Sequence, residues 1–350
     1  MPDLRTLVKT LAVNLLDMSG TAWLLKPFYA GRGAILAFHR VLPAEVPVFV
    51  PANVVRAGQL RGALQYVVGN GLEIIPLDEV PDRLRRSARG SRRFIAITLD
   101  DGYRDNLLHA LPIFREFSAP FTVYPATGFV DRTVGCWPVF LEALLPRADR
   151  IVLEHHGDGR KLQLSCATAR EKAAAFGRLR QCGWAGDAVE RGLAAACTAH
   201  GLTPSRIMDE AFLSWEELGT LARDPLASIG VHTVSHASLG GLPADRAAWE
   251  IQTAREQLST RLGIPIRHIA YPYGSGGACG EREYQLAREM GFSTGVITSR
   301  GNLQDRHQFS LWSLPRHTLS MVRHSANERY LRVSLYGVWD SPLNGIWVRR

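Results

Sequence analysis

Short apolar runs alternate with stretches of helical periodicity along most of the chain. The apolar runs predict strands at residues 34–41, 72–77, 94–100, 121–124, 227–231, 266–271 and 294–298. Between them, apolar residues recur every three or four positions, which predicts helices at residues 57–69, 105–118, 215–223, 244–262 and 281–290. Strands separated by helices favour parallel βαβ units. Seven such strands favour a closed α/β barrel over an open sheet.

Residues 137–212 interrupt this alternation. They contain a candidate hairpin, formed by residues 151–154 and 162–165, and two helical patterns at 168–180 and 186–200. We therefore expect an α-rich insertion on the barrel. The predicted organisation is an N-terminal arm at residues 1–30, a barrel domain at 31–320 that contains the insertion, and a C-terminal tail at 321–350.

The N-terminal arm has its own apolar stripe. The stripe has helical spacing and consists of Leu4, Leu7, Val8, Leu11, Leu15 and Met18. It predicts an amphipathic helix that is too short and too polar to span a membrane. Asn14 and Asp17 interrupt the apolar region and no cleavage site is evident, so a signal peptide is not expected. Two interpretations stay open: a helix packed on the domain, or an interfacial helix with basic residues at its edge. The second would place a cytoplasmic protein in peripheral contact with the inner leaflet of a membrane.

Composition, charge and cysteine content restrict the class of protein to which the chain can belong. The chain is 46% hydrophobic and 21% charged, which is ordinary for a soluble globular protein. Its net charge of +8 comes mostly from arginine, with a cluster at residues 83–93 that we interpret as a solvated loop. No nucleic-acid-binding motif accompanies this charge, so no nucleic-acid partner is expected. Five cysteines without a CxxC pair argue against a disulfide framework and fit a reducing compartment.

Two polar signals follow predicted strands. Asp100 and Asp101 end a buried apolar run, where adjacent carboxylates repel each other unless a metal or a proton transfer uses them. His232 and His236 follow the strand at 227–231. One carboxylate and two imidazoles would form a three-ligand metal site with an open position, and the other carboxylate would be free to act as a base. The carboxyl ends of strands form the active-site face of α/β barrels.

The local conformation of the histidine segment can also be anticipated. A helical turn over residues 232–236 would place both imidazoles on one face. The hydroxyl groups of Thr233 and Ser235 would then bond to local backbone and hold the loop.

These residues resemble the motifs of polysaccharide deacetylases, the NodB-homology or carbohydrate esterase family 4 group. Thr98-Leu99-Asp100-Asp101-Gly102 resembles the first motif, T-F-D-D-G, and His232-Thr233-Val234-Ser235-His236 resembles the second, H-S/T-x-x-H. Ala270-Tyr271-Pro272-Tyr273-Gly274 is similar to the third, R-x-P-Y/F. The resemblance covers roughly residues 33–320. Residues 38–43 and 103–106 look like the branch found in exopolysaccharide and surface-glycan pathways.

The resemblance implies a distorted (β/α)7 barrel that removes N-acetyl groups from amino sugars of a polysaccharide or a lipid-linked glycan precursor. Asp101, His232 and His236 would hold one divalent metal ion, with Zn²⁺ the expected ion and other divalent ions open. Asp100 would be the general base that activates the attacking water, and the backbone N–H of Tyr273 would stabilise the oxyanion.

The sequence departs from the family pattern at two points. Ala270 stands where the family has an arginine that pairs with the base, and we expect Arg316 to supply that charge from another strand. The family's general-acid histidine has no clean match, so His39, His317 and His324 are the candidates. His155, His156 and His268 are taken as non-catalytic.

Aromatic and proline side chains near the motifs are candidate contacts for the sugar. Tyr103, Trp137 and Pro272 are the expected substrate-binding residues. Trp215 opens a predicted helix and is expected to pack instead.

Two alternative functions stay open. One is deformylation or another amide hydrolysis on the same scaffold. The other is a catalytically silent module that binds a glycan or a metal. Asp100 argues against the silent module, because a binder needs the metal ligands but not the base.

Overall fold

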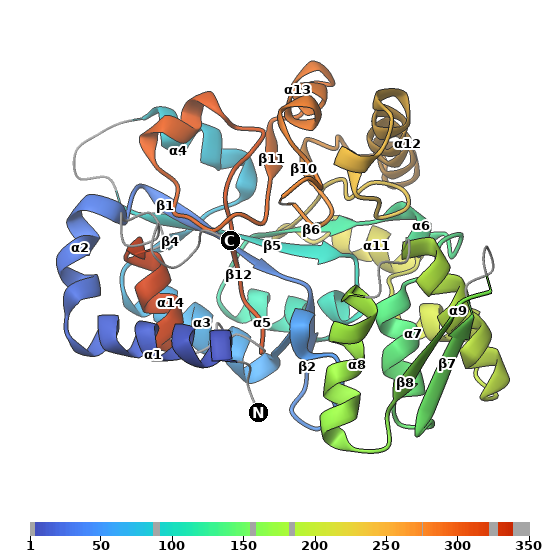
Figure 1. Cartoon of the computed structure of the whole chain (residues 1–350). Helices are drawn as coiled ribbons and strands as arrows, with labels where there is room; N and C mark the ends of the chain where they lie inside the picture. Colours follow the sequence, from blue (N-terminus) through green and yellow to red (C-terminus); the bar gives the residue numbers. More distant parts are fainter. Residues whose placement is uncertain are drawn as a thin grey trace.

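The computed structural model describes residues 4–86, 92–154, 159–181, 186–274, 276–321 and 328–338. Within them, parallel strands form a ring at the centre of the molecule (Figure 1). Its members are β1 (Gly33–Phe38), β5 (Phe94–Asp101), β6 (Phe121–Pro125), β9 (Ala227–Ile229), β10 (His268–Ala270), β11 (Thr294–Val296) and β12 (His317–Thr318). Their order is β12-β1-β5-β6-β9, and β10 pairs with β11.

Two single bridges close the ring. Val231, just after β9, pairs in parallel with Ile269 of β10, and Val296 of β11 pairs in parallel with Leu314, just before β12. The expected distorted (β/α)7 barrel is therefore confirmed. Its distortion lies where these isolated bridges replace continuous ladders.

The seventh strand is not the one predicted. Residues 72–77 contain only the two-residue strand β4 (Glu73–Ile74), which pairs with the first residues of β5. The seventh position belongs to β12, which was not predicted, because two residues carry no readable periodicity.

Helices surround the barrel. They are α3 (Ala57–Gly69), α4 (Val80–Arg85), α5 (Leu111–Glu116), α6 (Thr127–Val130), α11 (Trp215–Ala222), α12 (Ala244–Leu262) and α13 (Glu281–Glu289). A π-helical turn at Asn106–Ala110 precedes α5, so the helix predicted at 105–118 is divided in two. Two short strands, β2 (Arg40–Leu42) and β3 (Val54–Arg56), pair outside the ring.

Alternation along β5 separates two apolar layers. Ile95, Ile97 and Leu99 belong to the large cluster that packs under the surrounding helices. Phe94 and Ala96 belong to a second cluster that also contains residues of β1, β6, β10 and β11. Because side chains alternate along a strand, Asp100 shares the side of Phe94 and Ala96, which is the barrel interior.

The insertion forms a subdomain beside the carboxyl ends of the central strands (Figure 1). It contains α7 (Trp137–Leu144), the antiparallel hairpin β7 (Arg150–Glu154) and β8 (Lys161–Ser165), α8 (Ala169–Gln181), α9 (Gly186–Ala199) and α10 (Pro204–Ala211). Its helices and hairpin share a separate apolar core.

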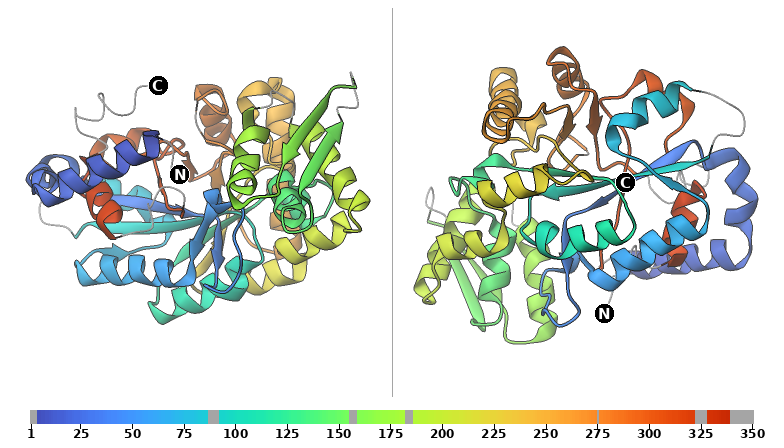
Figure 2. Two further views of the ribbon diagram at one scale, coloured as in Figure 1. Left: turned by 60° about the horizontal axis from the view of Figure 1, so that its bottom comes forward. Right: turned by 180° about the vertical axis from the view of Figure 1, so that it is seen from behind.

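The N-terminal arm is a pair of helices, α1 (Leu4–Met18) and α2 (Thr21–Tyr29). They pack against α14 (Glu328–Leu335), a helix in the segment expected to be a tail. Arg93, just before β5, donates to the carbonyls of Ala30 and Leu335 at 2.7 Å each, which fixes the arm at the amino ends of the strands. The arm and the insertion therefore lie on opposite sides of the barrel (Figure 2). No helix in the described part of the chain is long and apolar enough to cross a membrane.

Candidate active site

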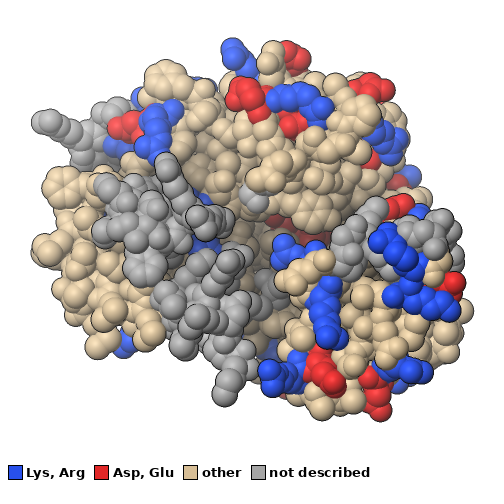
Figure 3. Space-filling model, viewed as in Figure 1, with Lys and Arg blue, Asp and Glu red and all other residues tan. Residues whose placement is uncertain are grey.

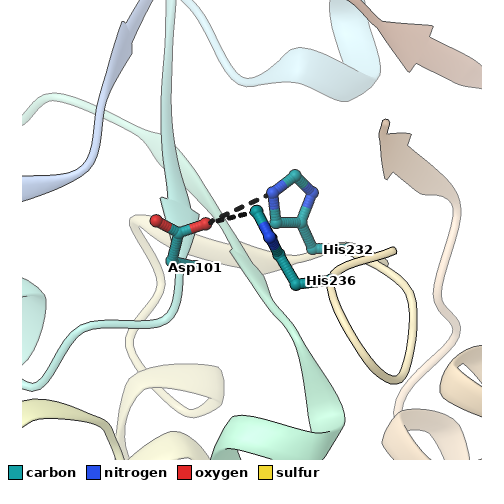
Figure 4. Close-up of side chains that lie close together, drawn as sticks. All are labelled: Asp101, His232 and His236. Carbon is teal, nitrogen blue, oxygen red and sulfur yellow. Dashed lines mark ion pairs between the residues drawn. The ribbon is translucent and has the colours of Figure 1, made fainter. Parts of the chain in front are cut away.

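Three side chains from two strand ends converge on one point (Figure 4). Oδ1 of Asp101 lies 3.4 Å from Nε2 of His232 and 3.2 Å from Nε2 of His236. The candidate ligand atoms all lie within 4.8 Å of one another. The Asp101 oxygen is buried yet accepts no hydrogen bond of good geometry. Burial raises the pKa of Asp101, but the two imidazoles outweigh this effect and hold it well below its usual value. An oxygen and two imidazole nitrogens in this arrangement fit a divalent metal ion.

The protonation of His232 suits a metal ligand. Its Nδ1 lies 2.7 Å from the carbonyl oxygen of Ala270, to which it can only donate. Nε2, on the side of Asp101, is then the nitrogen that would coordinate an ion. Ala270 of the third motif, which stands where the family has an arginine, therefore positions His232 through its backbone carbonyl.

Asp100 is paired with the arginine expected from the sequence. The Arg316 guanidinium donates to both carboxylate oxygens, with Nη1–Oδ1 at 2.7 Å and Nη2–Oδ2 at 2.8 Å. The same group donates to Oγ1 of Thr98 at 3.1 Å and to the carbonyl oxygen of Ile297 at 3.2 Å. Burial alone would raise the pKa of Asp100, but Arg316 more than offsets it and the pKa lies below its usual value. The carboxylate is therefore ionised and able to accept a proton.

His39 is the general-acid candidate that lies at the site. Its Nε2 is 3.9 Å from Oδ2 of Asp100. Burial lowers the pKa of His39, although the nearby Asp101 and Asp100 carboxylates act in the opposite sense. His317 is bonded to Asn302 at 2.9 Å, and burial lowers its pKa to about 3. It follows Arg316 in an extended segment, so it points away from the barrel interior.

The other histidines considered from the sequence do not lie at the site or are not described. His268 is a structural residue, bonded to Oγ1 of Thr294 at 2.8 Å and paired with Asp78 at 3.1 Å. His155, His156 and His324 lie outside the described residues.

The ligand-bearing turns adopt strained backbone. Of the six non-glycine residues with positive φ in the described chain, four belong to the site: Asp101, Thr233, His236 and Tyr273. Each such residue costs of order 1–3 kcal/mol and persists only where its surroundings enforce it. Gly102, at φ 76°, is also required, because a Cβ there would lie 2.7 Å from Cβ of Pro125. This strain marks the site as a pre-organised structure.

The histidine segment is an irregular loop, which corrects the expected helical turn. Ser235 does not bond to local backbone either. Its hydroxyl donates at 2.7 Å to Glu250 of α12, which also accepts the N–H groups of Val234 and Ser235 at 2.9 Å each. The hydroxyl of Thr233 is buried without a hydrogen-bond partner.

Glu250 is thus a positioning residue that the motifs did not identify. It is almost fully buried and accepts from three donors of the loop that carries His236. A signal was present in the sequence. Glu250 lies on the apolar face of its helix, between Ala247 and Ala254, where a charged residue needs partners.

The expected substrate contacts fall into different environments. Tyr273 is half exposed, and its ring meets that of His236 edge to face at 4.9 Å. Pro272, the preceding residue, is buried. Trp137 stacks on Phe176 within the insertion at 5.0 Å and is only partly buried.

Tyr103 does not suit the role expected for it. Its ring is 3% exposed, stacks on Phe212 at 4.7 Å and lies under the Arg40 guanidinium at 5.2 Å. No face is left for a sugar, so we correct this assignment to a core residue. Trp215 packs as expected, with its indole N–H donated to Asp131 at 2.8 Å.

Comparisons with known proteins identify the family. Residues 87–295, more than half of the chain, match the family model described as polysaccharide deacetylase. No curated protein sequence matches the chain.

Several solved structures share the fold. The Streptococcus pyogenes deacetylase PplD, in complex with acetate, is 18% identical with a TM-score of 0.54, over 82% of this chain and 92% of that one. IcaB from Ammonifex degensii is 17% identical with a TM-score of 0.54, over 87% and 97%. The BpsB deacetylase domain from Bordetella bronchiseptica is 17% identical with a TM-score of 0.50, over 82% and 95%. Likeness at these identities concerns the fold alone.

Proposed function

Because the chain belongs to the polysaccharide deacetylase family, we propose that it is a metal-dependent hydrolase that removes N-acetyl groups from the amino sugars of a polysaccharide or glycan precursor. The observation that carries the proposal is the Asp100–Arg316 pair beside Asp101, His232 and His236. A module that only binds would need the three ligands but not an ionised base with its own buried partner.

Asp101, His232 and His236 would hold the ion, for which Zn²⁺ is the first candidate because its protein ligands are imidazole nitrogens and carboxylate oxygens. When bound, such an ion lowers the pKa of water and polarises a carbonyl group. The chain itself fixes the ligand geometry through the Ala270 carbonyl, which orients His232, and through Glu250, which holds the loop of His236.

Asp100 would take the proton of the attacking water as the water oxygen bonds to the acetyl carbon. Arg316 keeps the carboxylate ionised and fixed in direction. The backbone N–H of Tyr273 would donate to the carbonyl oxygen as negative charge grows there. The strained turn at Tyr273, with φ at 62°, favours this assignment because a relaxed strand would direct the peptide differently.

The departing nitrogen must gain a proton when the C–N bond breaks. His39, close to Asp100, would receive that proton from the carboxyl group and pass it to the nitrogen. The products are acetic acid and the free amine, which leave as acetate and an ammonium group once the acid proton passes to the amine, and the Asp100 carboxylate is restored. Trp137 and Pro272 keep their proposed roles as contacts for the sugar.

The Asp100→Asn variant tests the proposal. The amide cannot accept the proton, so acetate release should fall by about 10²–10⁴-fold while bound metal is unchanged. Metal content is measured by elemental analysis, and acetate is measured with N-acetylated oligosaccharides. Asp209→Asn, on the exposed surface, is the matched control and should retain full activity.

Chelation separates the remaining alternatives. Loss of activity with a chelator and recovery with a divalent ion would support the enzyme and exclude the silent module. Formate released in place of acetate, from an N-formylated sugar, would favour the deformylase alternative. Undiminished acetate release by Asp100→Asn would contradict the assignment of the base.

We also propose the location expected from the sequence, which is the cytoplasm with contact to the inner leaflet of a membrane. Fractionation of cells that express the full chain, or the chain without residues 1–30, tests both. An unchanged soluble distribution of the two forms would argue against membrane contact.

A further inference from the structure

The N-terminal helices expose apolar side chains where solvent-facing helices usually expose charge. Eight residues between positions 11 and 30 are exposed, and seven of them are apolar: Leu11, Leu15, Met18, Trp23, Leu24, Pro27 and Phe28. The eighth is Ser19. We call these seven residues the arm face. Six of the thirteen large hydrophobic side chains exposed in the described chain belong to it.

The arm face is not the side through which α1 and α2 pack on the rest of the protein. The opposite side of α1 and α2 is already buried, with Val13 and Ala22 packed against Tyr330 and Val333 of α14. Asp17 accepts hydrogen bonds from Nε and Nη2 of Arg332 at 2.7 and 2.8 Å. The pair of helices is therefore docked on the barrel and still presents a second apolar side. Trp23 is 64% exposed and Phe28 is 78% exposed.

Basic residues outnumber acidic ones within the arm itself. Asp17 is the only acidic residue from position 4 to 30, and Arg332 and Arg329 neutralise it at 2.7 and 3.8 Å. Lys26 of α2 and, along the sequence of α1, Arg5 and Lys9 are basic. Figure 3 shows the left-hand surface, which α2 forms, almost without blue or red atoms, whereas the insertion at lower right carries many.

We propose that the arm face docks the protein on an anionic membrane surface. Aromatic and aliphatic side chains on one side of a helix pair, with basic and no free acidic residues, match the interfacial mode of lipid binding. A second copy of the chain is a poorer occupant. The net charge of +8 repels another copy. This proposal does not depend on the deacetylase activity.

Vesicle cosedimentation of the full chain tests it. Wild-type protein should bind vesicles of phosphatidylcholine mixed with phosphatidylglycerol. Its affinity for them should fall as the salt concentration is raised. The Trp23→Ser/Phe28→Ser variant should bind at least roughly tenfold less tightly, because two interfacial anchors are lost. Deacetylation of a soluble oligosaccharide should not change, since neither residue contacts the site.

The Leu108→Ser/Val152→Ser variant is the matched control, because both side chains are exposed apolar residues away from the arm. It should bind vesicles like the wild type. Circular dichroism and a thermal melt show that each variant is folded, and Phe28→Ser alone provides a milder change. The proposal would be overturned if the wild-type protein did not bind vesicles, or if both double variants lost vesicle binding to the same extent. A dimer, independent of vesicles, that only the arm variant dissociates would also overturn it.

Discussion

At Asp100, the proposed base, the arginine partner comes from a different strand than in the family motif. Ala270 of β10 has no charge to offer, and Arg316 enters from the segment before β12. Arg316 is completely buried, and every bond it makes is within the barrel. A buried ion pair costs desolvation on both sides, and only good geometry with further hydrogen bonds offsets it. The two-pronged contact and the bonds to Thr98 and Ile297 meet that condition.

Arg316→Met should therefore damage catalysis more than metal binding. The Asp100 carboxylate would lose its partner, and we expect the turnover number to fall by about 10²-fold or more while metal content is spared. Removing one member of a buried pair should also lower the free energy of unfolding by about 3–5 kcal/mol, which a denaturant melt measures.

Arg316→Lys is the matched variant for this experiment. It keeps the charge but cannot make two parallel bonds, so it should recover part of the activity and part of the stability. Normal turnover in the methionine variant would show that Asp100 does not need Arg316.

At the scale of elements, the site is built from strand ends whose loops are held from outside the barrel. The loop of His236 is bonded to Glu250 of α12, and its backbone is also bonded to α6, with the Gly128 N–H donated to the Val234 carbonyl at 2.8 Å. Since Thr233 and His236 have positive φ, this loop would relax without such contacts. Helix α12 therefore supports the loop of the proposed metal ligands as well as the core.

Glu250→Gln tests this support. The glutamine NH₂ would face backbone and hydroxyl donors that now meet a carboxylate oxygen, so the loop should loosen. We expect metal affinity to fall by about 10–100-fold, as for other residues that orient ligands. Metal competition with a chromophoric chelator measures it, independently of turnover.

Glu256→Gln, exposed on the same helix, is the control and should bind metal normally. If excess metal did not restore activity in Glu250→Gln, the residue would have a role beyond positioning the ligand loop.

The elements that could be predicted are those with long, local patterns. The eight buried residues of β5 and the nineteen residues of α12 were recognised because burial and periodicity repeat along them. The two residues of β12 exist because they pair with Leu36 and Ala37 of β1, far away in the sequence. The conformation of residues 232–236 likewise depends on Glu250, a tertiary contact, so local propensity gave the wrong helical turn. The proximity of Asp101, His232 and His236 could be predicted because each of their motifs follows a strand.

Across the whole molecule, the candidate site and the arm face lie at opposite ends of the barrel (Figures 1 and 2). Asp100 and Asp101 end β5, whereas Arg93, before its first residue, binds the ends of α2 and α14. Eight residues of extended strand span roughly 25 Å. A protein docked through the arm face would hold its catalytic groups at least that far from the lipid headgroups.

This separation predicts a preference among membrane-linked substrates. On anionic vesicles, the wild-type enzyme should deacetylate a long N-acetylated glycan anchored to lipid, because the chain can extend to the site. A single N-acetylated sugar on a short lipid linker should react at least about tenfold more slowly, because a linker that cannot span the distance gives almost no effective concentration. Acetate release from both substrates measures this, and the same two sugars in soluble form are the controls. The Trp23→Ser/Phe28→Ser variant, free in solution, can approach a vesicle in any orientation and should discriminate less between them. Equal rates on the long and short anchored substrates with the wild-type enzyme would place the membrane contact near the site instead of opposite it.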